Sequence, residues 1–70
     1  MAAVNRDDRV LRIRQAMAVT GLGRTCLYSL VKEGRFPAPI KLTHYSVGWL
    51  DSEVRAWLAD RVDASRKAAA

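Results

Sequence analysis

The residues best suited to chemistry lie on one face of a short predicted helix that is bounded by glycines. They are basic, hydroxyl-bearing and aromatic: Arg24, Thr25, Tyr28, Ser29 and Lys32. Long basic side chains reach base edges or phosphates, short hydroxyls let a backbone approach phosphates, and an aromatic ring stacks or contacts a thymine methyl group. This combination favours contact with double-stranded DNA. The competing interpretation is an ordinary solvated helix face, with Tyr28 partly packed in the core.

Four further residues extend the predicted DNA-binding set beyond this helix. Arg35 follows the helix end, where it suits a phosphate contact better than base reading. His44 and Tyr45 stand in the tip of a predicted hairpin, and Lys41 precedes them. At that tip they would reach a phosphate or an adjacent minor groove. An unengaged loop is the equally weighted alternative.

Catalysis is not expected, and neither a cofactor nor a metal ion is predicted. The single histidine, His44, and the single cysteine, Cys26, fall in different predicted elements. The chain also lacks paired carboxylates in an acid–base arrangement, a glycine loop for phosphates and a metal-ligand cluster. One cysteine excludes an internal disulfide and fits a reducing, cytoplasmic environment. We expect Cys26 to be a small buried residue rather than a redox switch.

The charge of the chain is concentrated in one part. The 70 residues carry a net charge of +5. Up to Trp49 there are eight cations and three anions, whereas from Asp51 onward four cations balance four anions. A surplus confined to one region indicates a polyanionic partner, with general solubility as the alternative. The N-terminus lacks the apolar core of a secretory signal, and no apolar run is long enough to span a membrane.

Two short helices are expected to position the basic face. Residues 1–9 are predicted to be a flexible arm, and residues 10–13 either a brief strand or an extended lead into a helix at 14–19. Gly21 suits the positive-φ position that ends a helix. A second helix at 24–33 would stop at Gly34. Its apolar residues, Leu27, Leu30 and Val31, share one face. The predicted core contains these three and four residues from around the first helix and the turn, namely Leu11, Ile13, Met17 and Leu22. Two helices joined through T-G-L form a helix-turn-helix pattern.

A hairpin and a third helix complete the predicted domain. Proline at 37 and 39 excludes a helix there, and β-prone residues at 40–42 and 47–50 flank a four-residue tip. Gly48 indicates a bulge or close backbone contact, or simply a flexible residue. Asp51 is predicted to cap a third helix that ends near residue 62 or 63, before a frayed tail at 64–70. Trp49 and Trp57 are expected in the core, with a dimer contact as the alternative.

This pattern resembles a known family. The residues L-R-I-R-Q-A-M-A-V-T-G-L-G-R-T-C-L-Y-S-L-V-K-E-G-R-F-P-A-P-I-K-L, followed by V-G-W-L-D-S-E-V-R-A-W-L, are similar to the AlpA family of phage-type regulators, grouped with MerR-like and excisionase-like proteins. The resemblance implies a mainly α winged helix-turn-helix domain at residues 10–63, with three helices and a small β-hairpin. Helix 24–33 would enter the major groove and the 40–50 hairpin would serve as the wing. Gly23, Cys26, Ser29 and Tyr45 depart from the family pattern, which removes a helix cap and two positive charges.

The implied function is sequence-specific regulation of transcription from a prophage or mobile element. An excisionase-like architectural factor that assists integrase is the alternative, and a protein-interaction module with an acidic partner is a weaker one. Integrase and RNA polymerase are the candidate protein partners. A homodimer or cooperative assembly on DNA is also expected, because so short a chain gains from self-association.

Overall fold

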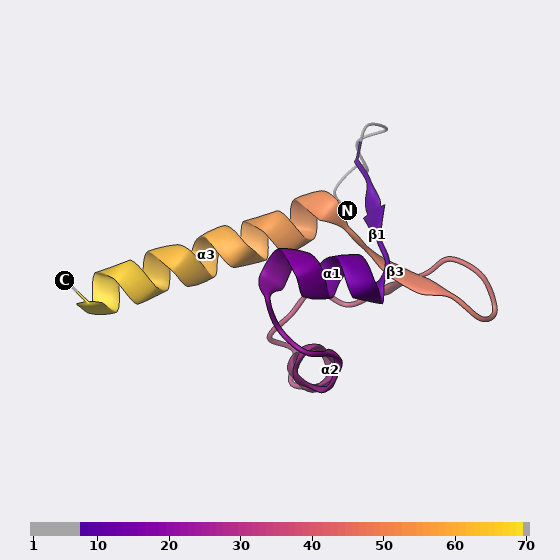
Figure 1. Ribbon diagram of the computed structural model, residues 1–70, viewed down its shortest axis with the longest axis horizontal. Helices are drawn as coiled ribbons and strands as arrows, with labels where there is room; N and C mark the ends of the chain where they lie inside the picture. Colours follow the sequence, from indigo (N-terminus) through magenta and orange to yellow (C-terminus); the bar gives the residue numbers. More distant parts are fainter. Residues whose placement is uncertain (1–7, 70) are drawn as a thin grey trace.

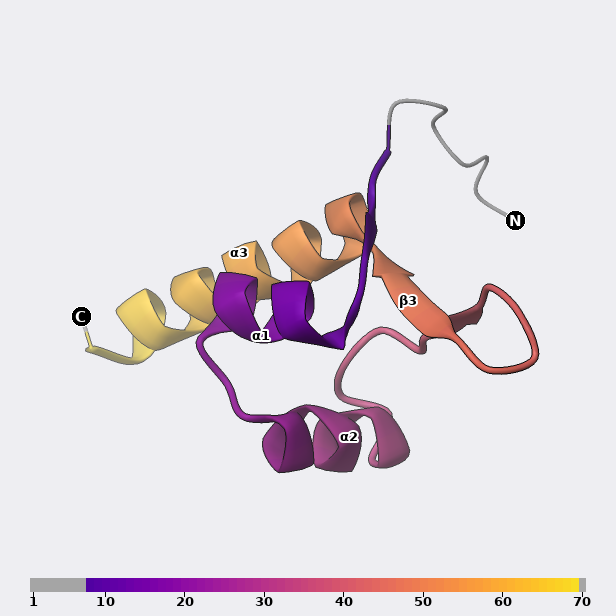
Figure 2. The ribbon, with the colours of Figure 1, turned by 45° about the vertical axis from the view of Figure 1, so that its right-hand side comes forward.

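The computed structural model describes residues 8–69, which form three helices and a small antiparallel sheet (Figure 1). In chain order the elements are β1 (Val10–Leu11), α1 (Ile13–Thr20), α2 (Arg24–Lys32), β2 (Ile40–Lys41), β3 (Val47–Leu50) and α3 (Asp51–Ala69). In both ribbon views α1 lies between α3 and α2 (Figures 1 and 2). The predicted fold class, mainly α with a winged-helix-like hairpin, is confirmed.

The sheet joins the hairpin to the start of the domain. Strand β3 is central, with β1 and β2 antiparallel on either side. Leu11 pairs with Trp49, and Ile40 pairs with Gly48. Residues 10–11 are therefore a strand, which settles the choice that the sequence left open. Gly48 is buried at a close approach, because a Cβ there would lie 2.5 Å from Val10 Cγ1 and 3.1 Å from the Leu11 carbonyl oxygen.

The core gathers around α1 and β3. Its buried members are Leu11, Ala16, Leu27, Phe36, Trp49 and Val54. Trp57 is partly buried against this cluster. The same is true of the other predicted core residues of the two helices and their turn, which are Ile13, Met17, Leu22, Leu30 and Val31. Ala16 was not predicted, although it is fully buried. A methyl side chain carries little periodic signal, and only the packing of α1 reveals its place.

Glycine geometry sets the ends of the two short helices. Gly21 has φ 74°, and its amide donates to the Met17 carbonyl at 2.8 Å, which ends α1 as predicted. Gly34 has the same φ, and the following amide of Arg35 donates to the Leu30 carbonyl at 2.8 Å. The start of α2 is weaker, because Gly23 adopts an extended N-cap conformation without a side chain to accept from the free amides.

The predicted Asp51 cap is wrong. The Asp51 carboxylate instead accepts from Arg55 Nε at 2.9 Å, one turn along α3. The first turn of α3 is bound by Asp8, whose carboxylate accepts from the amide and the hydroxyl of Ser52. The Arg9 carbonyl also accepts from the Asp51 amide at 2.7 Å. Two residues of the predicted flexible arm are thus joined to α3, while residues 1–7 of that arm lie outside the described part of the chain.

Helix α3 is longer than the apolar pattern predicts. It continues to Ala69, through the predicted tail, rather than ending near residue 63. Alanine, arginine and lysine in the added turns favour helix, and Arg66 and Lys67 lie where the helix dipole favours positive charge. Within residues 8–69, no helix is both long enough and apolar enough to cross a membrane.

Candidate nucleic-acid interface

Helix α2 is held to the core by one side, and its remaining surface faces solvent. Leu27 is fully buried, and Leu30 and Val31 are partly buried against the core. The residues predicted to contact DNA from this helix are all exposed: Arg24, Thr25, Tyr28, Ser29 and Lys32. Figure 2 shows α2 at one edge of the domain, with α1 between it and α3. The structure therefore leaves the whole outer surface of α2 open to a large partner.

Trp49 connects this helix to the hairpin. Its side chain is fully buried in β3, and its indole Nε1 donates to the Pro37 carbonyl at 2.8 Å. The ring of Tyr28 packs beside it, with centroids 6.2 Å apart, and Phe36 lies edge-on at 6.1 Å. The sequence predicted Trp49 as a core residue, but not this connecting role. Helix α2 and strand β3 are thus positioned by one shared side chain.

Tyr28 combines the two roles that the sequence left open. It packs on Trp49, yet 42% of it remains exposed. A phenol has an apolar ring and a polar hydroxyl, so the ring suits the packed position and the hydroxyl suits a solvated one. The contact with Trp49 holds the ring without removing the side chain from the open surface.

The hairpin tip is ordered by its own hydroxyl groups. The side chains of Thr43 and Ser46 share a hydrogen bond of 2.5 Å, and the Tyr45 amide donates to Thr43 Oγ1 at 3.2 Å. Tyr45 is 97% exposed, and its ring lies 5.9 Å from that of His44. The hairpin extends to one side of the domain in both ribbon views, beyond the other described elements there (Figures 1 and 2). The tip therefore presents two aromatic side chains to solvent, beside the exposed Lys41.

The exposed cations of this surface are almost uncompensated. Among the described residues, the two ion pairs join Arg35 to Glu33 at 3.8 Å and Arg55 to Asp51 at 2.9 Å. Both partners of the first pair are well exposed, so it neutralises little of the Arg35 charge. Arg24, Lys32 and Lys41 have no described carboxylate within ion-pair distance. Their charge is available to an anion.

Comparison with known proteins now assigns the family. The family model described as "Prophage CP4-57 regulatory protein (AlpA)" matches residues 9–62. This chain belongs to the AlpA family. The predicted resemblance is confirmed, and with it a phage regulatory role. The protein named "Uncharacterized protein ORF88" of Enterobacteria phage P4 is 43% identical over 61 residues, which cover 87% of this chain and 68% of that protein. No solved structure matches significantly.

The predicted burial of Cys26 in this AlpA-family chain is wrong, because the thiol is exposed. Cys26 follows the outward-facing Thr25 and precedes the buried Leu27, so it lies on the flank of α2. There it lines a groove toward α3 together with Leu22, Leu30 and Trp57. From the sequence, Cys26 lies between the apolar and the polar face of α2. Whether a side chain at that position is exposed depends on where α3 lies, and here it is exposed.

Trp57 of α3 contacts the segment that follows α2. Its indole Nε1 donates to the Arg35 carbonyl, and its ring lies edge-on to Phe36 with centroids 4.9 Å apart. These contacts hold the backbone just after α2 without using the Arg35 guanidinium. The side chain of Arg35 stays exposed on the surface, where its one described ion pair is the exposed contact with Glu33. Within the described residues there is no cluster of three or more metal-binding side chains.

Proposed function

We propose that this AlpA-family protein is a sequence-specific double-stranded DNA-binding regulator of transcription from a prophage or mobile element. Helix α2 enters the major groove, and the β2–β3 hairpin acts as the wing. The protein acts in the cytoplasm, and integrase or RNA polymerase is its protein partner. The family and its phage relative support the regulatory part of this proposal.

The observation that carries the proposal is the two-sided character of α2. Leu27 is completely buried, whereas Arg24, Thr25, Ser29 and Lys32 are exposed on a helix of 9 residues. Such a helix is about 13 Å long, and the major groove of B-DNA is about 12 Å wide. Its rigid apolar attachment allows it to lie in the groove while the rest of the domain stays outside.

The side chains divide into base readers and phosphate contacts. Arg24, in the first turn of α2, has the fork of donors that binds guanine O6 and N7. Its position also lies where the helix N-terminus favours anions, so a phosphate is its other partner. Thr25, Tyr28 and Ser29 offer hydroxyls to base edges or phosphates. Lys32 and Arg35, at the far end, contact phosphates.

The wing contributes a second contact. Lys41 brings charge, and His44 and Tyr45 bring aromatic rings with polar atoms, to a tip that projects from the domain. These side chains reach the phosphates or the minor groove that flank the site of α2. Trp49 of β3 packs against Tyr28 of α2, and this packing sets the spacing between the two contacts.

The decisive experiment is a DNA-binding assay with fragments of the replicon that encodes the protein. Fluorescence anisotropy with the promoter regions of the protein's own gene and of any neighbouring integrase should show tighter binding than random DNA of equal length. Footprints over repeated attachment-site sequences, with induced bending, would assign the excisionase-like role instead. Equal affinity for every fragment and for random DNA would refute sequence-specific regulation.

A further inference from the structure

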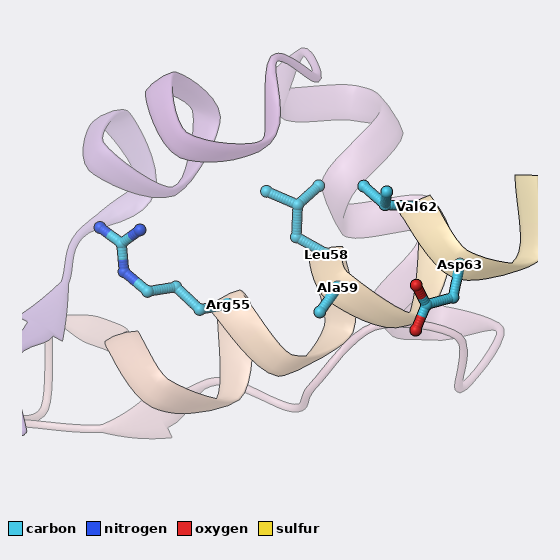
Figure 3. A pocket seen from close by; sticks show the side chains of 5 residues that line it. All are labelled: Arg55, Leu58, Ala59, Val62 and Asp63. Carbon is cyan, nitrogen blue, oxygen red and sulfur yellow. The ribbon is translucent and has the colours of Figure 1, made fainter. Parts of the chain in front are cut away.

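Helix α3 carries an open groove that no other described element lines. Its lining comes from α3 alone and consists of Arg55, Leu58, Ala59, Val62 and Asp63 (Figure 3). Val62 is 39% exposed, although it is a large apolar residue. The C-terminal part of α3 also extends past the end of α1 in both ribbon views (Figures 1 and 2). This part of the helix therefore presents apolar side chains to solvent.

The two charged residues of the groove, Arg55 and Asp63, lie where a two-fold axis would pair them between two copies of α3. Arg55 and Asp63 lie four residues on either side of Ala59, which places each about 6 Å from it along the helix axis. A two-fold axis through Ala59 would bring the Arg55 of each copy to the Asp63 of the other. The small side chain at the centre would let the two helices approach closely, with Leu58 and Val62 packed beside it.

The polarity of the whole helix favours the same arrangement. The first turn of α3 carries Asp51 and Glu53, and the last turn carries Arg66 and Lys67. Antiparallel pairing places the acidic end of one helix beside the basic end of the other, whereas parallel pairing would oppose like charges. Like charges across an interface disfavour that arrangement strongly.

The local contacts leave both central charges available. Arg55 donates from Nε to Asp51, so the terminal nitrogens of its guanidinium remain free to bind a second carboxylate. Asp63 is exposed, and no described residue forms an ion pair with it. The groove thus holds an unused acceptor at one end and an unused donor at the other.

We propose that α3 is a self-association surface, on which a second copy of this chain binds through its own α3, antiparallel and two-fold about Ala59. The interface is isologous, so the same residues serve both copies. Leu58 and Val62 supply the apolar contact, and the Arg55–Asp63 pairs set direction and register. This assignment does not rest on the proposed DNA binding, because it concerns a different surface and is tested without DNA.

The first test measures the mass of the full chain alone. Sedimentation equilibrium should show a species of twice 7.8 kDa, with half-dissociation on the order of 100 µM because the interface is small. Asp63→Arg and Arg55→Asp should each weaken association at least about tenfold, because each opposes like charges across the axis. An equimolar mixture of the two variants should associate as the wild type does, since every pair in the mixed dimer is again of opposite sign.

Asp60→Arg is the matched control, because it makes the same charge change on α3 outside the groove. It should leave association within about twofold of the wild type. Circular dichroism of each variant checks that the fold is kept. The Arg55→Asp/Asp63→Arg double variant should associate with itself as the wild type does, because opposite charges again face each other between its two copies. A monomeric wild type up to about 1 mM, or a mixture that stays monomeric, overturns the proposal.

The second test locates the axis by cross-linking. In a Cys26→Ser background, Ala59→Cys should form an intermolecular disulfide rapidly on mild oxidation, because the axis brings the two positions together. Ala56→Cys is the control, since Ala56 is exposed on α3 but outside the groove. Equal cross-linking of the two variants would refute the two-fold contact at Ala59, and it would leave the DNA-binding proposal unaffected.

Discussion

The carboxylate of Asp8 holds the first turn of α3, where it accepts hydrogen bonds from both the amide and the hydroxyl of Ser52, 44 residues away. These bonds lower the pKa of Asp8, the Ser52 hydroxyl more than the Ser52 amide, while desolvation opposes them. A carboxylate at this position also meets the positive end of the helix dipole. The start of the described chain is therefore joined to the longest helix of the domain.

Asp8→Ala should lower the melting temperature, because α3 loses an acceptor for its free amides. The folded-state pKa of Asp8 is below its unfolded value, so its stabilising effect is complete above the unfolded pKa of about 4. The effect is lost as the pH falls further, through the folded pKa. Thermal melts at pH 7 and pH 2.5 should thus show a larger difference between variant and wild type at pH 7 than at pH 2.5. Asp60→Ala, an exposed position later in α3, should show a smaller difference at pH 7.

Arg24→Ala should weaken binding to the specific DNA site by about 1–3 kcal/mol if the guanidinium reads a guanine. Arg24→Lys keeps the charge but loses the two-pronged donor geometry. It should therefore retain affinity for random DNA and lose discrimination at one base pair. Anisotropy titrations against the site and its single-base variants measure both effects. Equal losses on specific and random DNA would make Arg24 a phosphate contact.

Lys32→Ala should reduce affinity for all DNA sequences to a similar degree, because an ammonium group at the end of α2 contacts phosphates. The slope of log K against log salt should decrease in magnitude by about one, since one fewer counterion is released. Lys67→Ala removes the same charge from the far end of α3. Its salt slope should match that of the wild type, and an equal change in both variants would place the DNA elsewhere.

Tyr28 offers a matched pair of substitutions that separates packing from binding. Tyr28→Phe keeps the ring against Trp49 and should leave the unfolding free energy nearly unchanged. Tyr28→Ala removes that contact and should cost roughly 1–2 kcal/mol of stability. If the hydroxyl contacts DNA, both variants lose affinity. A Tyr28→Phe variant with wild-type affinity would restrict the residue to packing and apolar contact.

Gly48→Ala should destabilise the sheet by on the order of 1–3 kcal/mol. The new methyl group would lie 2.5 Å from Val10 Cγ1 and 3.1 Å from the Leu11 carbonyl oxygen, so the Val10 side chain has to turn away and the Leu11 carbonyl has to give by a few tenths of an ångström. Gly23→Ser is the control, because a Cβ there meets nothing within 4 Å and the backbone is already extended. It should raise stability by a few tenths of a kcal/mol through a new helix cap. Urea denaturation measures both changes.

The sequence by itself determined the elements whose signals are local. Glycine at 21 and 34, proline at 37 and 39, and the spacing of Leu27, Leu30 and Val31 predicted two short helices and a hairpin close to those observed. It also identified the family. All nine predicted DNA-contacting residues are exposed, as such a role requires, and their contact with DNA remains a prediction. These features depend on backbone preferences and apolar periodicity within a few residues.

The tertiary structure alone decided the features that join distant parts of the chain. It placed β1 against β3, exposed Cys26, buried Ala16 and gave Tyr28 a packed as well as an open side. It also replaced the expected Asp51 cap with one from Asp8. A hydrogen bond across 44 residues, or the open flank of one helix beside another, depends on where the elements meet. No local pattern contains that information, because it arises only when the core brings those elements together.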